Sequence, residues 1–357
     1  MTSPIATPWL SGQADQDPRS ATGRTLRWGV IATGSIATAV AADLALLADA
    51  ELHGVSSRTQ ERADKFAAEF GFSKAYGNDA GVHGYDRLLA DDAVDVVYVA
   101  SPHGQHYEIV QAALNAGKHV LCEKAFTING REAVELIDLA RAKKLFLMEA
   151  VWSRFLPGMQ RAFQIAASGE LGDLHWVSAD LGFPAPYSPT ARLWAREDGG
   201  GALLDITVYP LLWALGTMGF PQTVSASGFV NDDGVDAQNA LTLGYNHGGQ
   251  AQLTSSLLAH GPRTATVAGS LGYLQSVGSI NNPREINVAI GWDGERRTES
   301  FEIVGKGYTY ELREVTRCIQ QDLTESPVMP LEDTLATMRL FDGVRAQLGT
   351  TYPNDHR

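Results

Sequence analysis

The first part of the chain alternates short runs of β-branched apolar residues with longer stretches whose apolar residues recur every three or four positions. The runs predict buried parallel strands, and the longer stretches predict helices that cover them. Gln60–Phe70, for example, has helical spacing and stops at Gly71. Such alternation between Leu26 and Ala150 predicts a doubly wound parallel sheet of the Rossmann type.

The predicted elements of this part share that alternation. After the first strand, which ends at Ile31, further strands are predicted at Leu52–Ser56, Asp92–Ala100, Lys118–Glu123 and Leu145–Met148. Helices are predicted at Ile36–Leu47 with Ser35 as its cap, Gln60–Phe70, Gly104–Ala116 and Asn129–Lys143.

The pattern changes after Trp152. A helix is predicted at Leu156–Ser168, and from Leu174 onward apolar and polar residues alternate, with Gly, Asn and Asp turns between the segments. The alternating segments are Leu174–Leu181, Thr223–Phe229, Ala240–Tyr245, Gln250–Ser256, Thr264–Ala268, Tyr273–Val277, Ile286–Ile290 and Ser300–Ile303. Further helices are predicted at Ala202–Leu215, Tyr308–Asp322 and Leu331–Leu348. The pattern predicts a C-terminal α+β domain with a large open, mostly antiparallel sheet.

Length favours two domains, because 357 residues exceed what one hydrophobic core usually supports. We expect a flexible N-terminal tail over residues 1–24, a dinucleotide-binding Rossmann domain over 25–150, and a substrate-binding and dimerisation domain over 151–357, which the terminal helices close. The tail is rich in Ser, Thr, Pro, Gln and Asp and lacks the features of a signal peptide.

Charge and cysteine content narrow the class of function. A net charge of −13 argues against binding to nucleic acids or to anionic membranes. The two cysteines, Cys122 and Cys318, are far apart in the sequence, which excludes a disulfide framework and fits a reducing compartment such as the cytoplasm. No apolar run reaches the length of a membrane span.

The stretch after the first strand has the spacing of a dinucleotide-binding turn. Ala32, Gly34 and Ala37 occupy the three small positions of the pattern G-x-G-x-x-G/A, where small residues allow the turn, the approach of a pyrophosphate and helix packing. The other residues of the turn are Thr33, Ser35 and Ile36. Ala32 stands where Gly is usual, and similar small turns also connect strands to helices without any ligand.

The residues after the second strand bear on the choice of cofactor. A carboxylate at this place binds the ribose 2′-hydroxyl of NAD, but here Ser57 and Arg58 follow the strand. A hydroxyl and a guanidinium suit the 2′-phosphate of NADP, so NADP is favoured over NAD. The alternative is that Arg58 is a solvated loop residue.

Polar side chains also follow the later strands of this domain. Ser101, His103 and His106 follow one strand and are candidates for contact with the cofactor or the substrate. No Asp, Glu or Cys flanks the two histidines at ligand spacing, so we expect no metal. Glu123 and Lys124 follow the next strand, either as a salt-bridged strand end or as part of a site in which the ammonium group polarises a carbonyl or hydroxyl.

In the second domain a run of three glycines leads to Asp205 and Tyr209, which are four residues apart and therefore expected on one helix face. A nearby Lys⁺ would lower the pKa of a tyrosine from its ordinary value of about 10 and let it relay a proton. The alternative is a tyrosine packed against the sheet. Arg192 and Trp194, in a loop between Phe183 and Trp194, are candidates for substrate contact or simple packing residues.

Taken together, these segments resemble the Gfo/Idh/MocA family of oxidoreductases over roughly Leu26–Leu348, within it most closely the branch of dimeric dihydrodiol dehydrogenase and NADP-dependent sugar dehydrogenases. The resemblance is carried by the segments Trp28–Ala37, Ser101–His106, Glu123–Lys124, Met148–Trp152 and the Gly-rich run to Asp205 and Tyr209. It implies a Rossmann domain and an open sheet through which dimers often form. It also implies that Lys124 belongs to a Glu-Lys-Pro motif and that Tyr209 is the acid–base residue. The sequence departs from the family pattern at Ala125 in place of proline, Thr207 in place of glycine and His103 in place of asparagine.

The expected function is an NADP-dependent oxidoreductase that transfers hydride between nicotinamide and a hydroxyl or carbonyl carbon of a sugar, polyol or cyclic trans-diol. Lys124, Asp205 and Tyr209 are the expected catalytic residues, and Trp152 and Arg192 the further substrate contacts. The alternatives are a sugar–sugar oxidoreductase with a tightly bound cofactor and a non-catalytic regulator that senses NADP. We expect a homodimer or a dimer of dimers, because one face of the open sheet would remain apolar and uncovered.

Overall fold

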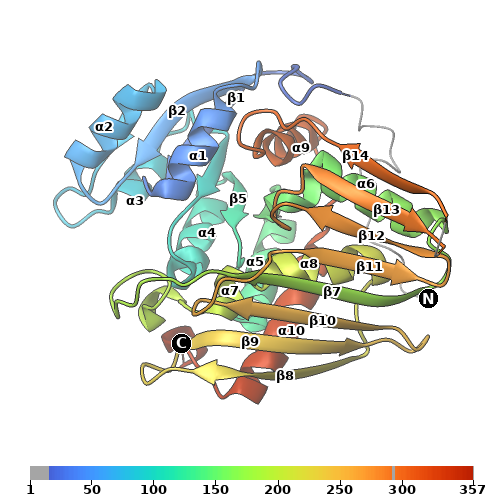
Figure 1. Cartoon of the computed structure of the whole chain (residues 1–357). Helices are drawn as coiled ribbons and strands as arrows, with labels where there is room; N and C mark the ends of the chain where they lie inside the picture. Colours follow the sequence, from blue (N-terminus) through green and yellow to red (C-terminus); the bar gives the residue numbers. More distant parts are fainter. Residues whose placement is uncertain (1–15, 292–293, 357) are drawn as a thin grey trace. The chain divides into compact units, whose positions relative to one another are not determined.

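The computed structural model describes residues 16–291 and 294–356, so residues 1–15 of the expected tail lie outside the described residues (Figure 1). The chain divides into two compact units. One unit contains residues 16–152 and 304–335, and the other contains, within the described residues, 153–303 and 336–356.

The first unit is built on a six-stranded parallel sheet of order β3-β2-β1-β4-β5-β6. Its strands are β1 (Leu26–Ile31), β2 (Ala50–Ser56), β3 (Lys74–Tyr76), β4 (Val96–Val99), β5 (His119–Glu123) and β6 (Leu147–Ala150). The connecting helices are α1 (Ser35–Leu44), α2 (Gln60–Phe70), α3 (Gly84–Leu89), α4 (His106–Asn115) and α5 (Gly130–Lys143). The predicted doubly wound sheet is confirmed, with all residues of β4 and β6 buried as a central parallel sheet requires.

Local sequence explains where these helices begin and end. The Thr59 hydroxyl accepts a hydrogen bond from the Arg62 N–H at the start of α2, and Gly71 ends this helix in the left-handed conformation with φ 84°. At α1 the predicted cap is wrong, because Gly34 holds the N-cap position and Ser35 is the first helical residue. β3 and α3 were not predicted, because they are three and six residues long and too short to show a clear period.

Residues near both ends of the chain complete the first unit. The Asp49 carboxylate pairs with Arg313 at 2.6 Å and accepts the Thr22 N–H at 2.8 Å. The Asp43 carboxylate accepts the N–H groups of Lys306 and Tyr308, just before α9 (Thr309–Gln320), which packs on α1. These buried carboxylates anchor the returning segment to the helices beside β1 and β2.

The second unit is built on an eight-stranded sheet of order β14-β13-β12-β11-β7-β10-β9-β8. Only the pair β7 (Leu174–Gly182) and β10 (Gln250–Ser256) is parallel; the other neighbours are antiparallel, as predicted for most of this sheet. The remaining strands are β8 (Thr223–Val230), β9 (Asp236–Gly244), β11 (Ala265–Gly269), β12 (Gly272–Val277), β13 (Glu285–Ile290) and β14 (Arg296–Ser300).

Helices cover one face of this sheet. Helix α8 (Val208–Met218) packs on β7, β10 and β11, and α6 (Pro157–Ser168) packs on β13 and on α8 (Figure 1). The last α-helix of the described chain is α10 (Leu331–Leu348), and a short 3-10 helix at Pro353–His356 follows it. Among the described residues no single helix is long and apolar enough to cross a membrane, although Arg196–Asp205 and Val208–Met218, bent by 45°, pass that test as a pair. Every residue of α8 except Thr217 is buried in the unit.

The opposite face of the sheet exposes many polar side chains, so the predicted large apolar open face is wrong. In β10 the buried residues Ala251 and Leu253 alternate with Gln250, Gln252 and Thr254, which are exposed. Because side chains alternate between the two faces of a sheet, the apolar side chains of such a strand point to the face that the helices cover. The larger exposed apolar side chains of the sheet include Trp176 and Tyr273.

Candidate active site

The turn after β1 has the conformation that a phosphate-binding turn requires. Ala32 has φ 83°, a left-handed conformation that glycine adopts more readily, and its N–H donates to the Ser56 carbonyl at 3.1 Å. Gly34 is exposed, and a Cβ atom added to it would meet nothing within 4 Å. The first turn of α1, which contains Ser35 and Ile36, holds no acidic residue. Open space therefore faces free N–H groups at the positive end of a helix, which fits a pyrophosphate.

Polar groups at the end of β2 lie beside this turn. The Ser57 and Thr33 hydroxyl oxygens are 2.9 Å apart. Arg58 is exposed and makes no hydrogen bond or ion pair within the described chain. Its guanidinium group is therefore available to an anionic ligand, and this end of β2 offers no carboxylate that would repel one.

The residues after β4 are buried rather than open to solvent. The Ser101 hydroxyl is buried and has no hydrogen-bond partner among the described residues. His106 is fully buried, with Nδ1 at 2.9 Å from the Ala125 carbonyl oxygen and Nε2 at 2.9 Å from that of Ser101. Burial lowers the pKa of His106. Nε2 of His103 lies 3.0 Å from the Lys124 carbonyl oxygen. Both histidines thus contact the backbone of the loop that carries Lys124.

That loop follows β5 and is held by acidic side chains as well. Glu123 Oε1 accepts the Tyr98 hydroxyl at 2.5 Å, and its Oε2 accepts the Lys124 N–H at 3.2 Å. The Glu149 carboxylate accepts the Phe126 N–H at 3.0 Å. The peptide bond between Lys124 and Ala125 is cis. The backbone around Lys124 is thus hydrogen-bonded to side chains from β5, β6 and α4 and from the turn before α4.

In the second unit, the predicted single helix from Ala202 to Leu215 is wrong. The structure has two helices, α7 (Ala202–Asp205) and α8, so Asp205 ends one helix and Tyr209 lies in the first turn of the next. The Thr207 N–H and hydroxyl both donate to the Ala202 carbonyl, and Asn239 also binds the hydroxyl. These bonds replace the regular helical ladder at the break.

Asp205 and Tyr209 are both largely buried. The Asp205 carboxylate accepts a hydrogen bond from Arg192 at 2.7 Å, and the Arg192 side chain is half exposed. The predicted substrate residues Arg192 and Asp205 are therefore brought together, and Arg192 extends from the loop before α7 toward solvent.

The two tryptophans singled out in the sequence lie in packed surroundings. Trp152, in the first unit, is buried with its ring 4.7 Å from that of Tyr308. Trp194, in the second unit, is 2% exposed, and its Nε1–H donates to the Pro186 carbonyl.

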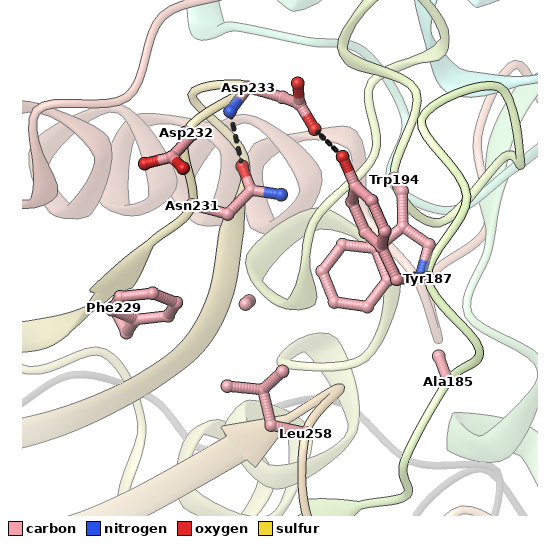
Figure 2. A pocket seen from close by; sticks show the side chains of 9 residues that line it. Ala185, Tyr187, Trp194, Phe229, Asn231, Asp232, Asp233 and Leu258 are labelled. Carbon is pink, nitrogen blue, oxygen red and sulfur yellow. Dashed lines mark hydrogen bonds between the residues drawn. The ribbon is translucent and has the colours of Figure 1, made fainter.

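A pocket of about 320 Å³, which no sequence pattern indicated, lies beside Trp194 in the second unit (Figure 2). Figure 2 shows the Tyr187 ring over this pocket, with its hydroxyl donating to the Asp233 carboxylate at 2.6 Å. Phe229 and Leu258 are about half exposed on the other side. The Asp233 bond fixes the loop that carries Arg192 to the turn between β8 and β9.

A buried acid also lies near the start of α7. Asp236 is fully buried, and its Oδ2 accepts the Leu203 N–H at 2.8 Å and an N–H of Asn239 at 3.0 Å. Burial raises the pKa of Asp236 to about 7. The sequence signal for this burial was that Asp236 stands between two apolar residues, Val235 and Ala237, which are both fully buried.

Comparisons with known proteins agree on one family. The model of the GFO/IDH/MocA oxidoreductases, described as an NAD-binding Rossmann fold, matches residues 26–151, and the model of the GFO/IDH/MocA C-terminal domain matches residues 159–275. The trans-1,2-dihydrobenzene-1,2-diol dehydrogenase of Mus musculus is 35% identical over 344 residues, covering 93% of this chain and 99% of that protein. The Homo sapiens protein of the same name is 33% identical over 344 residues, which again cover 93% of this chain and 99% of that protein.

A solved structure is also similar over nearly the whole chain. It is the crystal structure of a 3-ketoreductase from Actinomadura kijaniata in complex with NADP and TDP-benzene, with a TM-score of 0.78 and 28% sequence identity. The match covers 91% of this chain and 98% of that one.

Proposed function

Because this chain belongs to the GFO/IDH/MocA family of oxidoreductases, with its NAD-binding Rossmann fold, we propose that it transfers hydride between NADP and a CH–OH carbon of a cyclic trans-diol or sugar. The observation that carries the proposal is the turn after β1, where the left-handed Ala32 and the unobstructed Gly34 lead into the N-terminus of α1.

The residues of the first unit fit a dinucleotide. The N–H groups at Gly34, Ser35 and Ile36 would hold the pyrophosphate. The Ser101 hydroxyl, which has no partner among the described residues, would gain one from the ligand. The bound cofactor supplies a ring carbon that accepts or donates hydride. Hydrogen bonds between backbone groups of the Lys124 loop and the side chains of His103, His106 and Glu123, whose carboxylate accepts the Lys124 N–H, hold this loop in place for that ligand.

NADP is the proposed cofactor in preference to NAD. Arg58 is exposed and uncompensated within the described chain, and Ser57 beside it offers a hydroxyl instead of the carboxylate that favours NAD. The similar 3-ketoreductase was crystallised with NADP, which supports this choice.

Tyr209 is the proposed acid–base residue and Lys124 its electrostatic partner. During oxidation the C–H electron pair leaves as hydride, the hydroxyl proton passes to the Tyr209 oxygen, and a carbonyl remains. The role assigned to Lys124 is that of a positive charge, which would lower the pKa of the phenol and stabilise the developing alkoxide.

Asp205 is assigned to the substrate hydroxyl or to Lys124, with Arg192 holding its carboxylate at 2.7 Å. Trp152 and Arg192 are the proposed further contacts of the substrate. The printed names of the relatives, a trans-diol dehydrogenase and a 3-ketoreductase, support a vicinal diol or sugar as substrate.

A homodimer or dimer of dimers and a cytoplasmic location complete the proposal. The exposed rings of Trp176 and Tyr273 on the open sheet face support association, although polar residues such as Gln250, Gln252 and Thr254 are exposed on the neighbouring β10. Both Cys122 and Cys318 are buried free thiols, which agrees with a reducing compartment.

The test is reduction of NADP⁺, followed by absorbance, across trans-dihydrodiols, aldoses and inositols, with Tyr209→Phe as the inactive control. Turnover of a diol or sugar by the wild type alone supports the proposal. NADP binding without turnover of any of these would replace it with the sensing regulator. Turnover that needs two sugars and no added cofactor would replace it with the sugar–sugar oxidoreductase.

A further inference from the structure

The start of α7 is held by a buried side chain of β9, the strand on which this helix packs. Asp236, the first residue of β9, accepts the Leu203 N–H through Oδ2 at 2.8 Å. Gly201, which precedes α7, has φ 125°, and a Cβ atom added to it would lie 2.2 Å from Oδ1 of Asp236. The last of the three glycines is therefore required where α7 begins, because a larger residue would collide with the carboxyl group that holds the helix.

The same carboxyl group is connected to the other end of α7 through Asn239. Nδ2 of Asn239 donates to Oδ2 of Asp236 at 3.0 Å, and it lies 3.1 Å from the hydroxyl oxygen of Thr207, the second residue after α7. The Thr207 hydroxyl in turn donates to the Ala202 carbonyl at 3.1 Å. These hydrogen bonds join both ends of the four-residue helix to β9.

The strand that carries this network is a firm support. Asn239 is paired with Gly228 of β8 on one side and with Ser255 of β10 on the other. Asp236, Asn239 and Thr207 are all buried, and hydrogen bonds between buried groups are electrostatically stronger than those in water. The network therefore ties α7 to an interior strand of the sheet.

The side chains of the proposed reaction follow directly from this segment. Asp205 is the last residue of α7, and its N–H donates to the Gly201 carbonyl at 3.2 Å. Beyond the break, the Tyr209 N–H donates to the Ile206 carbonyl at 3.2 Å. The network thus acts on the backbone from which both Asp205 and Tyr209 extend.

We propose that Asp236 and Asn239 are positioning residues of the substrate site. Their hydrogen bonds set the place of α7 and of the break after it, and thereby the orientation of Asp205 and Tyr209. The proposal rests on the proposed function in so far as these two side chains act on the substrate. A displacement of about 1 Å in such groups can lower the rate about 100-fold, so a network away from the reacting atoms can control kcat.

Substitutions of Thr207 separate positioning from packing. Thr207→Val keeps the shape and removes the hydroxyl, so kcat should fall about tenfold at a temperature where the protein is fully folded. Thr207→Ser keeps the hydroxyl and should retain kcat to within about threefold of the wild type. The matched control is Thr217→Val on α8, because the Thr217 hydroxyl donates to the Trp213 carbonyl and takes no part in the network. Its kcat should be unchanged.

Substitutions on β9 test the other half of the network. Asn239→Leu and Asp236→Leu should each lower kcat about tenfold, whereas Asp236→Asn keeps an acceptor for the Leu203 N–H and should stay within about threefold. The double variant of Thr207→Val and Asn239→Leu should be little worse than the poorer single variant, because the two changes remove the same hydrogen bond. Binding of NADP⁺ should match the wild type throughout, because the proposed cofactor residues belong to the other unit.

The hold on α7 is observable without any activity. Amide hydrogen exchange of the segment 201–209, followed by mass spectrometry, should be about tenfold faster in Thr207→Val and in Asn239→Leu than in the wild type. In Thr217→Val the exchange of this segment should be unchanged.

The outcomes are distinct. Unchanged exchange of the segment 201–209, or folded Thr207→Val and Asn239→Leu proteins with wild-type kcat, would overturn the inference. Equal losses of kcat in Thr207→Val and Thr207→Ser would also overturn it, because the hydroxyl would then have no part in the effect. A wild type without oxidoreductase activity would overturn the proposed function, while hydrogen exchange would still report whether the network holds α7.

Discussion

The hydroxyl oxygens of Thr33 and Ser57 lie 2.9 Å apart and join the turn after β1 to the end of β2. The two residues are 24 positions apart in the sequence, but the parallel register that pairs Ile31 with Ser56 places them side by side. The next residue, Arg58, therefore extends from a fixed point beside the proposed pyrophosphate site, which makes its substitution informative.

Replacement of Arg58 by Ala should raise the KM for NADP⁺ by about 10- to 100-fold, because a charged hydrogen bond to the 2′-phosphate is lost. The KM for NAD⁺ should change little. Steady-state kinetics with both cofactors provide the measurement, and Lys65→Ala on the exposed side of α2 is the control. A wild-type enzyme that prefers NAD⁺ would contradict the proposal.

Replacement of Tyr209 by Phe should lower kcat by about 10²- to 10⁴-fold while substrate still binds, since the ring is kept and the proton relay is lost. Single-turnover kinetics and a substrate binding titration would separate the two effects. Near-normal kcat would make Tyr209 a packing residue of α8 and transfer the acid–base role elsewhere.

Replacement of Lys124 by Ala should lower kcat at least as far as Tyr209→Phe, because a charge that stabilises the developing alkoxide is removed. The double variant should be little worse than the poorer single variant, since residues that act as one unit are not additive. The rate of oxidation should rise toward alkaline pH, and Lys124→Ala should shift the midpoint of that rise upward. Additive losses in the double variant would show that the two residues act independently.

Replacement of Asp236 by Asn should change how stability depends on pH. The pKa of Asp236 in the folded protein is about 7, against 3.8 as its ordinary value, so the folded state binds a proton that the unfolded state releases between these values. Asp236 therefore makes its full contribution to the free energy of unfolding below pH 3.8, and this contribution is lost as the pH rises to about 7. The predicted loss is about 4 kcal/mol across that window.

In Asp236→Asn this loss should disappear, so the variant should gain stability relative to the wild type above about pH 7. Urea unfolding at several pH values is the measurement, with Asp232→Asn in the turn that precedes β9 as an exposed control. Parallel pH curves for wild type and Asp236→Asn would show that Asp236 is ionised throughout.

Replacement of Trp176 by Arg should weaken self-association if the open sheet face forms the dimer. Trp176 is 43% exposed on β7, and burial of its ring would contribute roughly 1.5–3 kcal/mol. Sedimentation velocity at micromolar concentration should give a dimer or tetramer for the wild type and a smaller species for the variant. A monomeric wild type would refute the expected assembly.

Local sequence patterns predicted the bounds of helices well where the helix was long or had clear capping residues. The bounds of α2 and α10 agree with the prediction, because α2 has a capping Thr59 and a terminal Gly71, and α10 is 18 residues long. The break between Asp205 and Val208 could not be predicted in this way. It depends on hydrogen bonds of Thr207 to Asn239, 32 residues further along the chain.

The candidate residues of the site followed from strand ends, but their surroundings did not. His106 follows β4 as predicted, yet no local pattern indicated that its ring lies between the carbonyl groups of Ser101 and Ala125. The full burial of Glu311 in α9 carried no sequence signal, because an acid in the first turn of a helix is ordinary at the surface. Burial of such a residue depends on which unit its helix joins, and this is a long-range property.

The return of residues 304–335 to the first unit has a consequence for biosynthesis. The ribosome releases β1 to β6 long before α9. During that time the Asp43 and Asp49 carboxylates have none of the partners that the later segment supplies, which are Lys306, Tyr308 and Arg313. The nascent dinucleotide-binding unit is therefore incomplete until almost the whole chain has been translated. Expression of residues 1–152 alone would leave Asp43 of α1 and the nearby Asp49 without these partners, whereas a circular permutant that begins at residue 304 would supply these contacts first.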